Sequence, residues 1–165
     1  MVQIKLSIVY HSISGNTQSV ARLIEQGAQK VDGVETRMIS INEPDFDFMG
    51  SSDCVIFGTP TYLGSFSWQM KTFLDKGLKI KLAGKMGAVF ATENYLGGGA
   101  DFGLMNLIGH LLVKGMMVYS AGVAEGNPYT HFGVVCIQDG DKDQQERAKI
   151  FGERIAKKAV ELFHK

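Results

Sequence analysis

The stretch Ser12-Ile13-Ser14-Gly15-Asn16-Thr17 joins an apolar run to an amphipathic one. The run before it, Ile4 to Tyr10, is typical of a buried strand, and Val20 to Val31 has the apolar spacing of a helix. The first N–H groups of a helix lack intrahelical partners and lie at the positive end of its dipole, so a turn of this kind favours an anion. Because the loop contains no Lys or Arg, it predicts a phosphate site built from neutral donors.

Two other phosphate-binding motifs are excluded by the same sequence. A P-loop requires Gly, four residues and then Gly-Lys-Ser/Thr, and no such run occurs. The dinucleotide fingerprint requires three glycines at fixed positions; Gly97 and Gly99 supply two, but Phe102 stands at the third. The alternative that stays open is a polar helix start without a ligand, since Ser, Thr and Asn are common N-cap residues.

The composition describes a globular chain without a charge excess. Of 165 residues, 45% are hydrophobic, and 17 basic residues balance 17 acidic ones. This length suits a single domain over residues 1–165, and the charge balance gives no reason to expect nucleic acid or a membrane surface as a partner. No signal-peptide pattern and no membrane-length apolar run is present, so we expect a cytoplasmic protein. Cys54 and Cys136 lie in apolar runs and are expected to be core thiols, and no ligand spacing predicts a metal site.

Strand-like and helix-like runs alternate along the whole chain. The remaining runs predict strands at 34–41, 53–58, 85–92 and 116–121, the last resuming at 132–137, and helices at 68–78, 101–114 and 144–163. Alternation of this kind predicts an α/β fold, a parallel sheet with helices on both faces. In such sheets ligands bind beyond the carboxyl ends of the strands, so the loops that follow strands are the informative ones.

The loops after the third and fourth strands offer a place for a flat ring. In the first of them Pro60 stiffens the turn, Gly64 permits a positive φ angle, and Tyr62 and Leu63 supply apolar contact. In the second, three consecutive glycines bring backbone N–H groups close to a ligand. A phosphate end beside a flat, partly apolar end fits FMN. The predicted FMN-binding residues are Ser12, Ser14, Gly15, Asn16, Thr17, Pro60, Thr61, Tyr62, Leu63, Gly64, Thr92, Glu93, Asn94, Tyr95, Gly97 and Gly98.

These motifs, taken in order, resemble those of the flavodoxin-like flavoproteins. Within them the chain looks most like the WrbA-type NAD(P)H:quinone oxidoreductases and the related FMN reductases. The first loop matches the family's Ser/Thr-x-Ser/Thr-Gly-x-Thr motif, residues 57–64 are similar to its Gly-Thr-Pro-Thr-x-x-Gly loop, and residues 97–99 match its glycine run. The resemblance implies a doubly wound sheet of five parallel strands in the order 2-1-3-4-5, and FMN as cofactor.

The resemblance also implies an activity. NAD(P)H would pass a hydride to the flavin, and a quinone or another small-molecule acceptor would then be reduced in the same place. Tyr129 and His131 are the candidates for guiding protons near the ring, because the family carries a Pro-Tyr segment there. The family also implies a homodimer or a higher homo-oligomer. The alternative is a flavodoxin, an electron carrier that docks to protein partners, although such carriers usually present an acidic face that this chain lacks.

Overall fold

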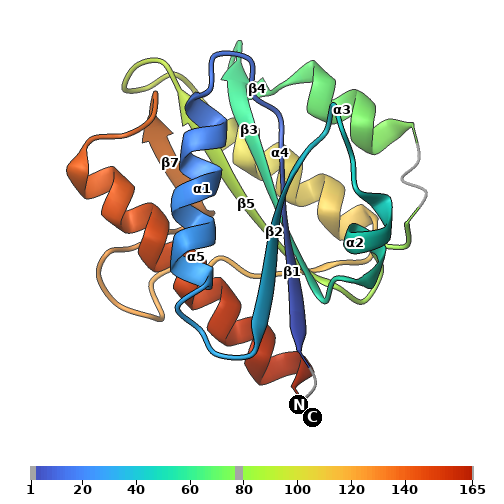
Figure 1. Ribbon diagram of the computed structural model, residues 1–165. Helices are drawn as coiled ribbons and strands as arrows, with labels where there is room; N and C mark the ends of the chain where they lie inside the picture. The colour runs from blue at the N-terminus through green and yellow to red at the C-terminus, as the bar shows by residue number, and fades with distance from the viewer. Residues whose placement is uncertain (1–2, 77–79, 165) are drawn as a thin grey trace.

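The computed structural model describes residues 3–76 and 80–164. A parallel sheet forms its middle layer (Figure 1). Its strands are β1 (Ile4–Tyr10), β2 (Val34–Ser40), β3 (Cys54–Tyr62), β5 (Met86–Glu93), β6 (Met117–Val118) and β7 (Val134–Ile137). The order is β2-β1-β3-β5, and both β6 and β7 pair with β5 on its far side. The predicted α/β fold and strand order are therefore confirmed, with the fifth position shared by two short strands.

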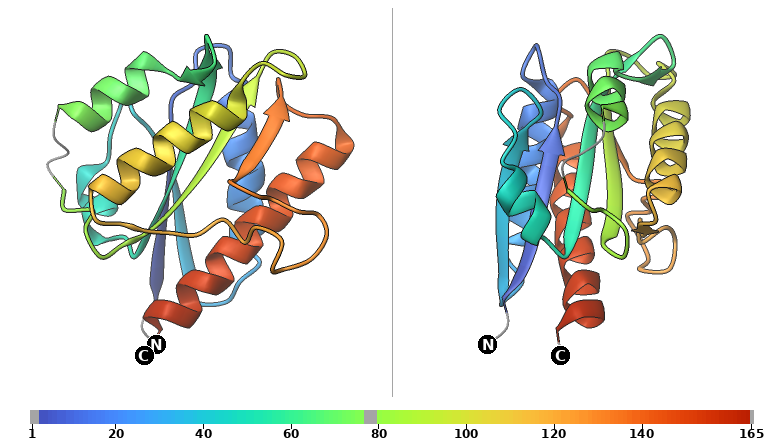
Figure 2. Two further views of the ribbon diagram at one scale, coloured as in Figure 1. Left: turned by 180° about the vertical axis from the view of Figure 1, so that it is seen from behind. Right: turned by 90° about the vertical axis from the view of Figure 1, so that its right-hand side faces the viewer.

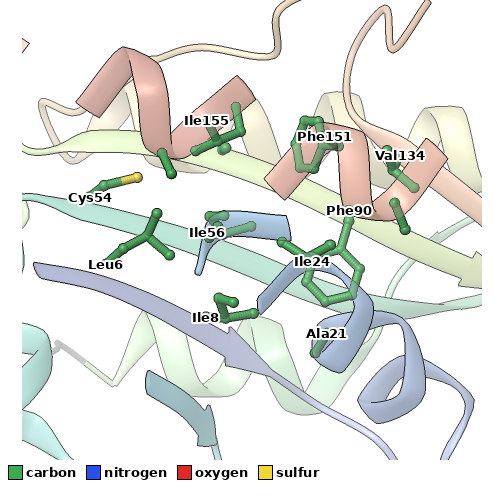
Figure 3. Close-up of a cluster of buried hydrophobic side chains, with 14 of the residues drawn as sticks. Leu6, Ile8, Ala21, Ile24, Cys54, Ile56, Phe90, Val134, Phe151 and Ile155 are labelled. Atoms are coloured by element: carbon green, nitrogen blue, oxygen red, sulfur yellow. The ribbon is translucent and has the colours of Figure 1, made fainter. Parts of the chain in front are cut away.

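Helices cover both faces of this sheet (Figures 1 and 2). One face carries α1 (Asn16–Ala28) and α5 (Lys142–Phe163), and the other carries α2 (Phe46–Ser51), α3 (Trp68–Asp75) and α4 (Ala100–Val113). Figure 3 shows the hydrophobic core between the sheet and the helices α1 and α5. In it Ile24 of α1 and Phe151 and Ile155 of α5 pack against strand residues such as Ile56. Every residue of β5 except Glu93 is buried, as expected for a strand that has neighbours on both edges and helices on both faces.

Side-chain oxygens fix where three of the helices begin. Asp45 accepts a hydrogen bond from Phe48 N at 2.9 Å, and Ser67 accepts one from Met70 N at 3.3 Å. Asp141 does the same at the start of α5. Each bond satisfies an N–H group that the helix itself cannot pair. The helix α1 differs, because its N-cap Gly15 makes no side-chain cap bond, so the first turn keeps its donors for another acceptor.

The structure corrects two of the predicted segments. The third strand continues beyond residue 58 to Tyr62 and turns back into β4 (Ser65–Phe66), with which it pairs antiparallel. Leu63 and Gly64 both have positive φ, at 49° and 76°, as a two-residue hairpin turn requires. The predicted connector at 42–50 holds most of α2, which ends at Ser51 and which the sequence analysis missed. The predicted end of the helix at 68–78, including Leu78, lies outside the described residues.

Both cysteines are buried and free, as expected of core thiols. Burial raises the pKa of the Cys54 thiol and raises that of Cys136 to about 12. No helix within the described ranges combines the length and the apolar character needed to cross a membrane.

Candidate functional site

The first loop and the carboxyl ends of β3 and β5 enclose a cavity of about 260 Å³. It lies where β1 passes into α1, at the upper end of the sheet in Figure 1. Its lining consists of Ile13, Ser14, Asn16, Thr17, Pro60, Thr61, Tyr62, Thr92, Glu93 and Asn94. All except Ile13 were predicted to bind the cofactor; Ile13 is an exposed loop side chain that the sequence analysis did not select. We call this space the phosphate cavity.

Two local contacts shape the phosphate cavity. Gly15 has φ of 96°, in the left-handed region that favours glycine, and its N–H donates to Ser12 Oγ at 3.2 Å. Ser12 therefore stabilises the loop through this hydrogen bond and does not line the cavity. Thr17 Oγ1 lies 2.8 Å from Thr92 Oγ1 in a buried hydroxyl pair that ties the first turn of α1 to the end of β5.

A second cavity, of about 630 Å³, adjoins the first, and we call it the ring cavity. It is lined by Thr61, Tyr62, Leu63, Gly64, Glu93, Asn94, Tyr95 and Gly98. The two cavities share Thr61, Tyr62, Glu93 and Asn94, so they adjoin at these residues. The phosphate cavity lies at the first turn of α1, whose N–H groups have no side-chain cap. The ring cavity is lined by Tyr62 and Tyr95.

The loops around the ring cavity touch backbone to backbone. A Cβ atom at Gly99 would come within 2.7 Å of Gly64 Cα, so only glycine permits the glycine run to approach the β3–β4 turn this closely. Glu93 Oε2 accepts a hydrogen bond from Ala100 N at 3.1 Å and so caps the start of α4. Gly97, another predicted cofactor residue, lines a neighbouring cavity with Gly99 instead.

The residues present fit a phosphate-bearing flat ligand. Thr61 Oγ1 is buried and has no hydrogen-bond partner, although it lies where the two cavities meet. A buried hydroxyl without a partner is costly, and a polar ligand edge would satisfy it. The lining of the phosphate cavity includes the carboxyl group of Glu93 and no lysine, arginine or histidine, so its hydrogen-bond donors are neutral groups.

A buried network of polar side chains lies next to the site and links the residue after β1 with β3 and the N-cap of α3. His11 Nδ1 lies 2.9 Å from Ser67 Oγ, and Ser67 N donates to Thr59 Oγ1 at 2.9 Å. The His11 ring also packs edge-on against Tyr62, with centroids 6.2 Å apart. Burial lowers the pKa of His11, so the ring is neutral at pH 7. The network thus joins the residue after β1 to the β3–β4 hairpin, which carries Tyr62. The sequence analysis did not identify it, because His11 and Ser67 are distant in the chain.

Tyr129 and His131 do not lie in this site. Their segment follows β6, which pairs with the beginning of β5, so it leaves the sheet far from the carboxyl end. Arg154 of α5 then holds it: Arg154 Nη1 donates to Pro128 O at 2.7 Å, and Nη2 donates to Glu125 O at 3.0 Å. Neither Tyr129 nor His131 lines the phosphate cavity or the ring cavity. The structure therefore does not place them where their predicted role needs them.

Comparison with known proteins identifies the family. The family model described as flavodoxin matches residues 8–151. A curated flavodoxin from Clostridium saccharobutylicum is 45% identical over 159 residues, which cover 96% of this chain and 99% of that protein. The chain belongs to the flavodoxin family. This membership confirms FMN as the cofactor predicted from the three loops.

Solved structures similar to this flavodoxin show the same fold. A WrbA-like flavodoxin from Agrobacterium tumefaciens has a TM-score of 0.81 and 24% identity, and the match covers 96% of this chain and 99% of that one. A variant flavodoxin from Fusobacterium nucleatum, bound to flavin mononucleotide, has a TM-score of 0.73 and 18% identity over 94% of this chain and 96% of its own. At these identities the likeness concerns the fold alone.

The comparisons overturn the expected activity. The sequence analysis favoured an NAD(P)H:quinone oxidoreductase, but the nearly full-length match at 45% identity is to a flavodoxin. That match points to an electron-transfer protein, which was the alternative. The oxidoreductase prediction was wrong because the phosphate and ring loops report the cofactor, and both classes of protein hold FMN in such loops. The overall charge balance does not separate the two classes of protein.

Proposed function

We propose that this protein is an FMN-binding electron carrier. The observation that carries the proposal is the joining of the phosphate cavity and the ring cavity through Thr61, Tyr62, Glu93 and Asn94. Together with the full-length likeness to a curated flavodoxin, this supports one bound FMN as the redox group. FMN supplies the chemistry, since a flavin exchanges electrons one at a time, and the protein supplies position and electrostatics.

The residues of the site divide this work. The first turn of α1, with Ser14 and Asn16, would bind the phosphate through neutral donors. Tyr62 and Tyr95 would contact the ring, and the Thr61 hydroxyl would pair with a polar ring atom. Leu63 and Tyr95 are largely exposed at the rim of the ring cavity, which supports electron exchange at an edge that a partner protein can approach.

Binding tests the assignment of the phosphate cavity. Apoprotein should bind FMN far more tightly than riboflavin, which has the same ring without the phosphate. Ser14→Ala should weaken FMN binding by roughly 1–3 kcal/mol, because a hydrogen bond to a charged group is lost, and should leave riboflavin binding unchanged. Ser19→Ala, an exposed serine on the same helix, is the matched control. Equal affinities for FMN and riboflavin would show that the phosphate cavity does not bind the phosphate of FMN.

Electrochemistry separates a carrier from an enzyme. The holoprotein should take up electrons in two separate one-electron steps in a potentiometric titration followed by visible absorbance. It should not turn over NADH or NADPH with a benzoquinone. Rapid steady-state oxidation of either nicotinamide by the isolated holoprotein would contradict the carrier proposal.

We also propose that the protein acts in the cytoplasm. Cys54 and Cys136 are free and buried in separate strands, which suits a reducing compartment. Fractionation of cells followed by detection of the protein tests this location; recovery with an oxidising compartment would contradict it.

A further inference from the structure

The loop at residues 94–99 joins β5 to α4 and forms part of the wall of the ring cavity. It lies at the upper end of the sheet in Figure 1. Tyr95 and Gly98 of this loop line the cavity. Gly97, Gly98 and Gly99 are consecutive. Glycine loses more backbone freedom on folding than any other residue, so a loop of this composition stays in one conformation only if other contacts hold it.

The side chain of Glu93 closes this loop. Glu93 is the last residue of β5, and Ala100 is the first residue of α4. Glu93 Oε2 accepts a hydrogen bond from Ala100 N at 3.1 Å, so a single bond joins the two ends of the loop. A hydrogen bond from an N–H group to a carboxylate is charge-assisted and is stronger than one between neutral groups.

This bond also supplies a cap that α4 does not obtain from its own N-cap residue. The N-cap of α4 is Gly99, which makes no side-chain cap bond, whereas α2, α3 and α5 are each capped by the side chain of their N-cap residue. The N–H group of Ala100 is one of those that a helix cannot pair internally, and a negative charge beside it also interacts favourably with the helix dipole. The start of α4 therefore depends on a carboxylate that comes from β5.

The Glu93 side chain also packs against the glycine run. A Cβ atom at Gly98 would lie 3.1 Å from both Glu93 Cβ and Glu93 Oε2, so the backbone of Gly98 lies directly against this side chain. Glu93 and Gly98 both line the ring cavity. A displacement of the carboxylate would therefore change the shape of the cavity wall at Gly98.

We propose that Glu93 is a positioning residue for the flavin ring. By accepting the bond from Ala100 N, its carboxylate holds residues 94–99 in the conformation in which Tyr95 and Gly98 line the ring cavity. The proposal rests on the FMN site described above. Without this bond the ring has to order the glycine run when it binds, and the free energy of that ordering lowers the affinity.

Two variants of Glu93 separate its role as an acceptor from its charge. Glu93→Gln and Glu93→Met both remove the charge and keep approximately the length of the side chain, but only glutamine has an oxygen that can accept from Ala100 N. The FMN dissociation constant of Glu93→Met should exceed that of Glu93→Gln at least about tenfold. Because neither variant is charged, repulsion between the Glu93 carboxylate and the FMN phosphate does not enter this comparison.

Spectroscopy distinguishes positioning of the ring from a loss of folding. Visible circular dichroism of bound FMN should differ from wild type in Glu93→Met and match it in Glu93→Gln, while far-UV spectra of both variants stay native. In the apoprotein the Ala100 amide should exchange with solvent faster in Glu93→Met than in Glu93→Gln. Asp101→Asn is the matched control, because Asp101 is an exposed carboxylate in the first turn of α4 that lines neither the phosphate cavity nor the ring cavity. It should bind FMN with the wild-type affinity and spectrum.

The outcomes distinguish a failure of this proposal from a failure of the FMN site. Equal FMN dissociation constants for Glu93→Gln and Glu93→Met would overturn the role of Glu93 and leave both the site and the carrier proposal intact. Equal exchange rates of the Ala100 amide in the two variants would overturn it as well, because the bond would then not hold the loop. A wild-type protein that binds no FMN would instead overturn the site on which the proposal rests.

Discussion

His11 connects two parts of the proposed FMN site that the sequence does not show to be linked. Its backbone N–H donates to Gly58 O at 3.1 Å, and its ring contacts Ser67 Oγ and Tyr62. Only 2% of the residue is exposed. A charged ring in this position would lose its hydration without gaining a carboxylate partner, which is why burial lowers the His11 pKa.

This lowered pKa predicts a pH dependence of stability. In the unfolded chain His11 takes up a proton below about pH 6.5, whereas the native state resists protonation until lower pH. The unfolded state then binds more protons, so stability falls as the pH drops below about 6.5 towards the native pKa. Urea unfolding of apoprotein at pH 7.5 and at lower pH should show a smaller fall for His11→Asn than for wild type. An equal fall in both would show that His11 does not contribute.

Thr61 and Gly15 show how single residues prepare the site before a ligand binds. Thr61 keeps a buried hydroxyl without a partner, and Gly15 holds a left-handed backbone conformation with no atom near its Cβ position. The conformation, not a steric clash, is therefore what requires glycine at residue 15. The unpaired Thr61 hydroxyl has a cost in the free protein that a bound ligand would offset, whereas glycine adopts the left-handed conformation without strain.

At the scale of elements, α1 and α5 pack unusually closely. A Cβ atom at Gly27 would lie 1.8 Å from Lys149 O, and one at Gly152 would lie 2.0 Å from Ile24 O. The two glycines thus lie at the crossing of the helices, where each backbone contacts the other. This contact fixes α1, and with it the first turn that would bind the phosphate.

The close contact predicts the effect of one methyl group. Gly152→Ala should lower the free energy of unfolding by about 1–3 kcal/mol, because the backbone of α1 must move away, even though alanine is the better helix former. Urea unfolding of apoprotein measures this change. Ser19→Ala on the exposed side of α1 should leave stability unchanged or slightly raised. A stabilising Gly152→Ala would show that the helices are not in backbone contact.

The strand at the fifth position illustrates how one element is divided. The two-residue β6 pairs with Met86 and Gly87, whereas β7 pairs with residues at the other end of β5. The intervening segment crosses to α5, where four carbonyl groups accept hydrogen bonds from Arg154. This arrangement explains why the Pro-Tyr segment, which the sequence analysis assigned to the flavin, lies elsewhere.

At the scale of the whole molecule, the proposed FMN site belongs to three separate parts of the chain. The first turn of α1, the β3–β4 hairpin and the end of β5 meet only when the sheet has formed. A ligand that contacts all three binds the native state and not the unfolded chain, so it must stabilise the whole fold.

FMN should therefore raise global stability by mass action. At a free concentration about one hundred times its dissociation constant, FMN should add about 2.7 kcal/mol to the free energy of unfolding. Chemical unfolding with and without FMN measures the gain. At the same FMN concentration the gain should be smaller for Ser14→Ala, because that variant should bind more weakly. An unchanged unfolding curve in the presence of FMN would mean that the native state does not bind it selectively.

Much of this architecture could be predicted because its signals are local. Short stretches of sequence are enough to recognise the apolar run of β1, the loop from Ser12 to Thr17 and the helical periodicity of α5. The short helix α2 was missed because six residues carry too little periodicity. The hairpin after Tyr62 was taken for a loop because a two-residue turn leaves little sequence signal beyond Gly64.

The sequence by itself determined the alternation of the main strands and helices, the absence of Lys and Arg from residues 12–17 and, through the family's motifs, the cofactor, since these depend on residues that are neighbours in the chain. Only the tertiary structure decided which residues meet: Thr17 with Thr92, His11 with Ser67, and Arg154 with the segment that contains Tyr129. Which apolar residues of α4 face outward was also decided there, because apolar residues lie on more than one side of this helix and the sheet covers only one of them.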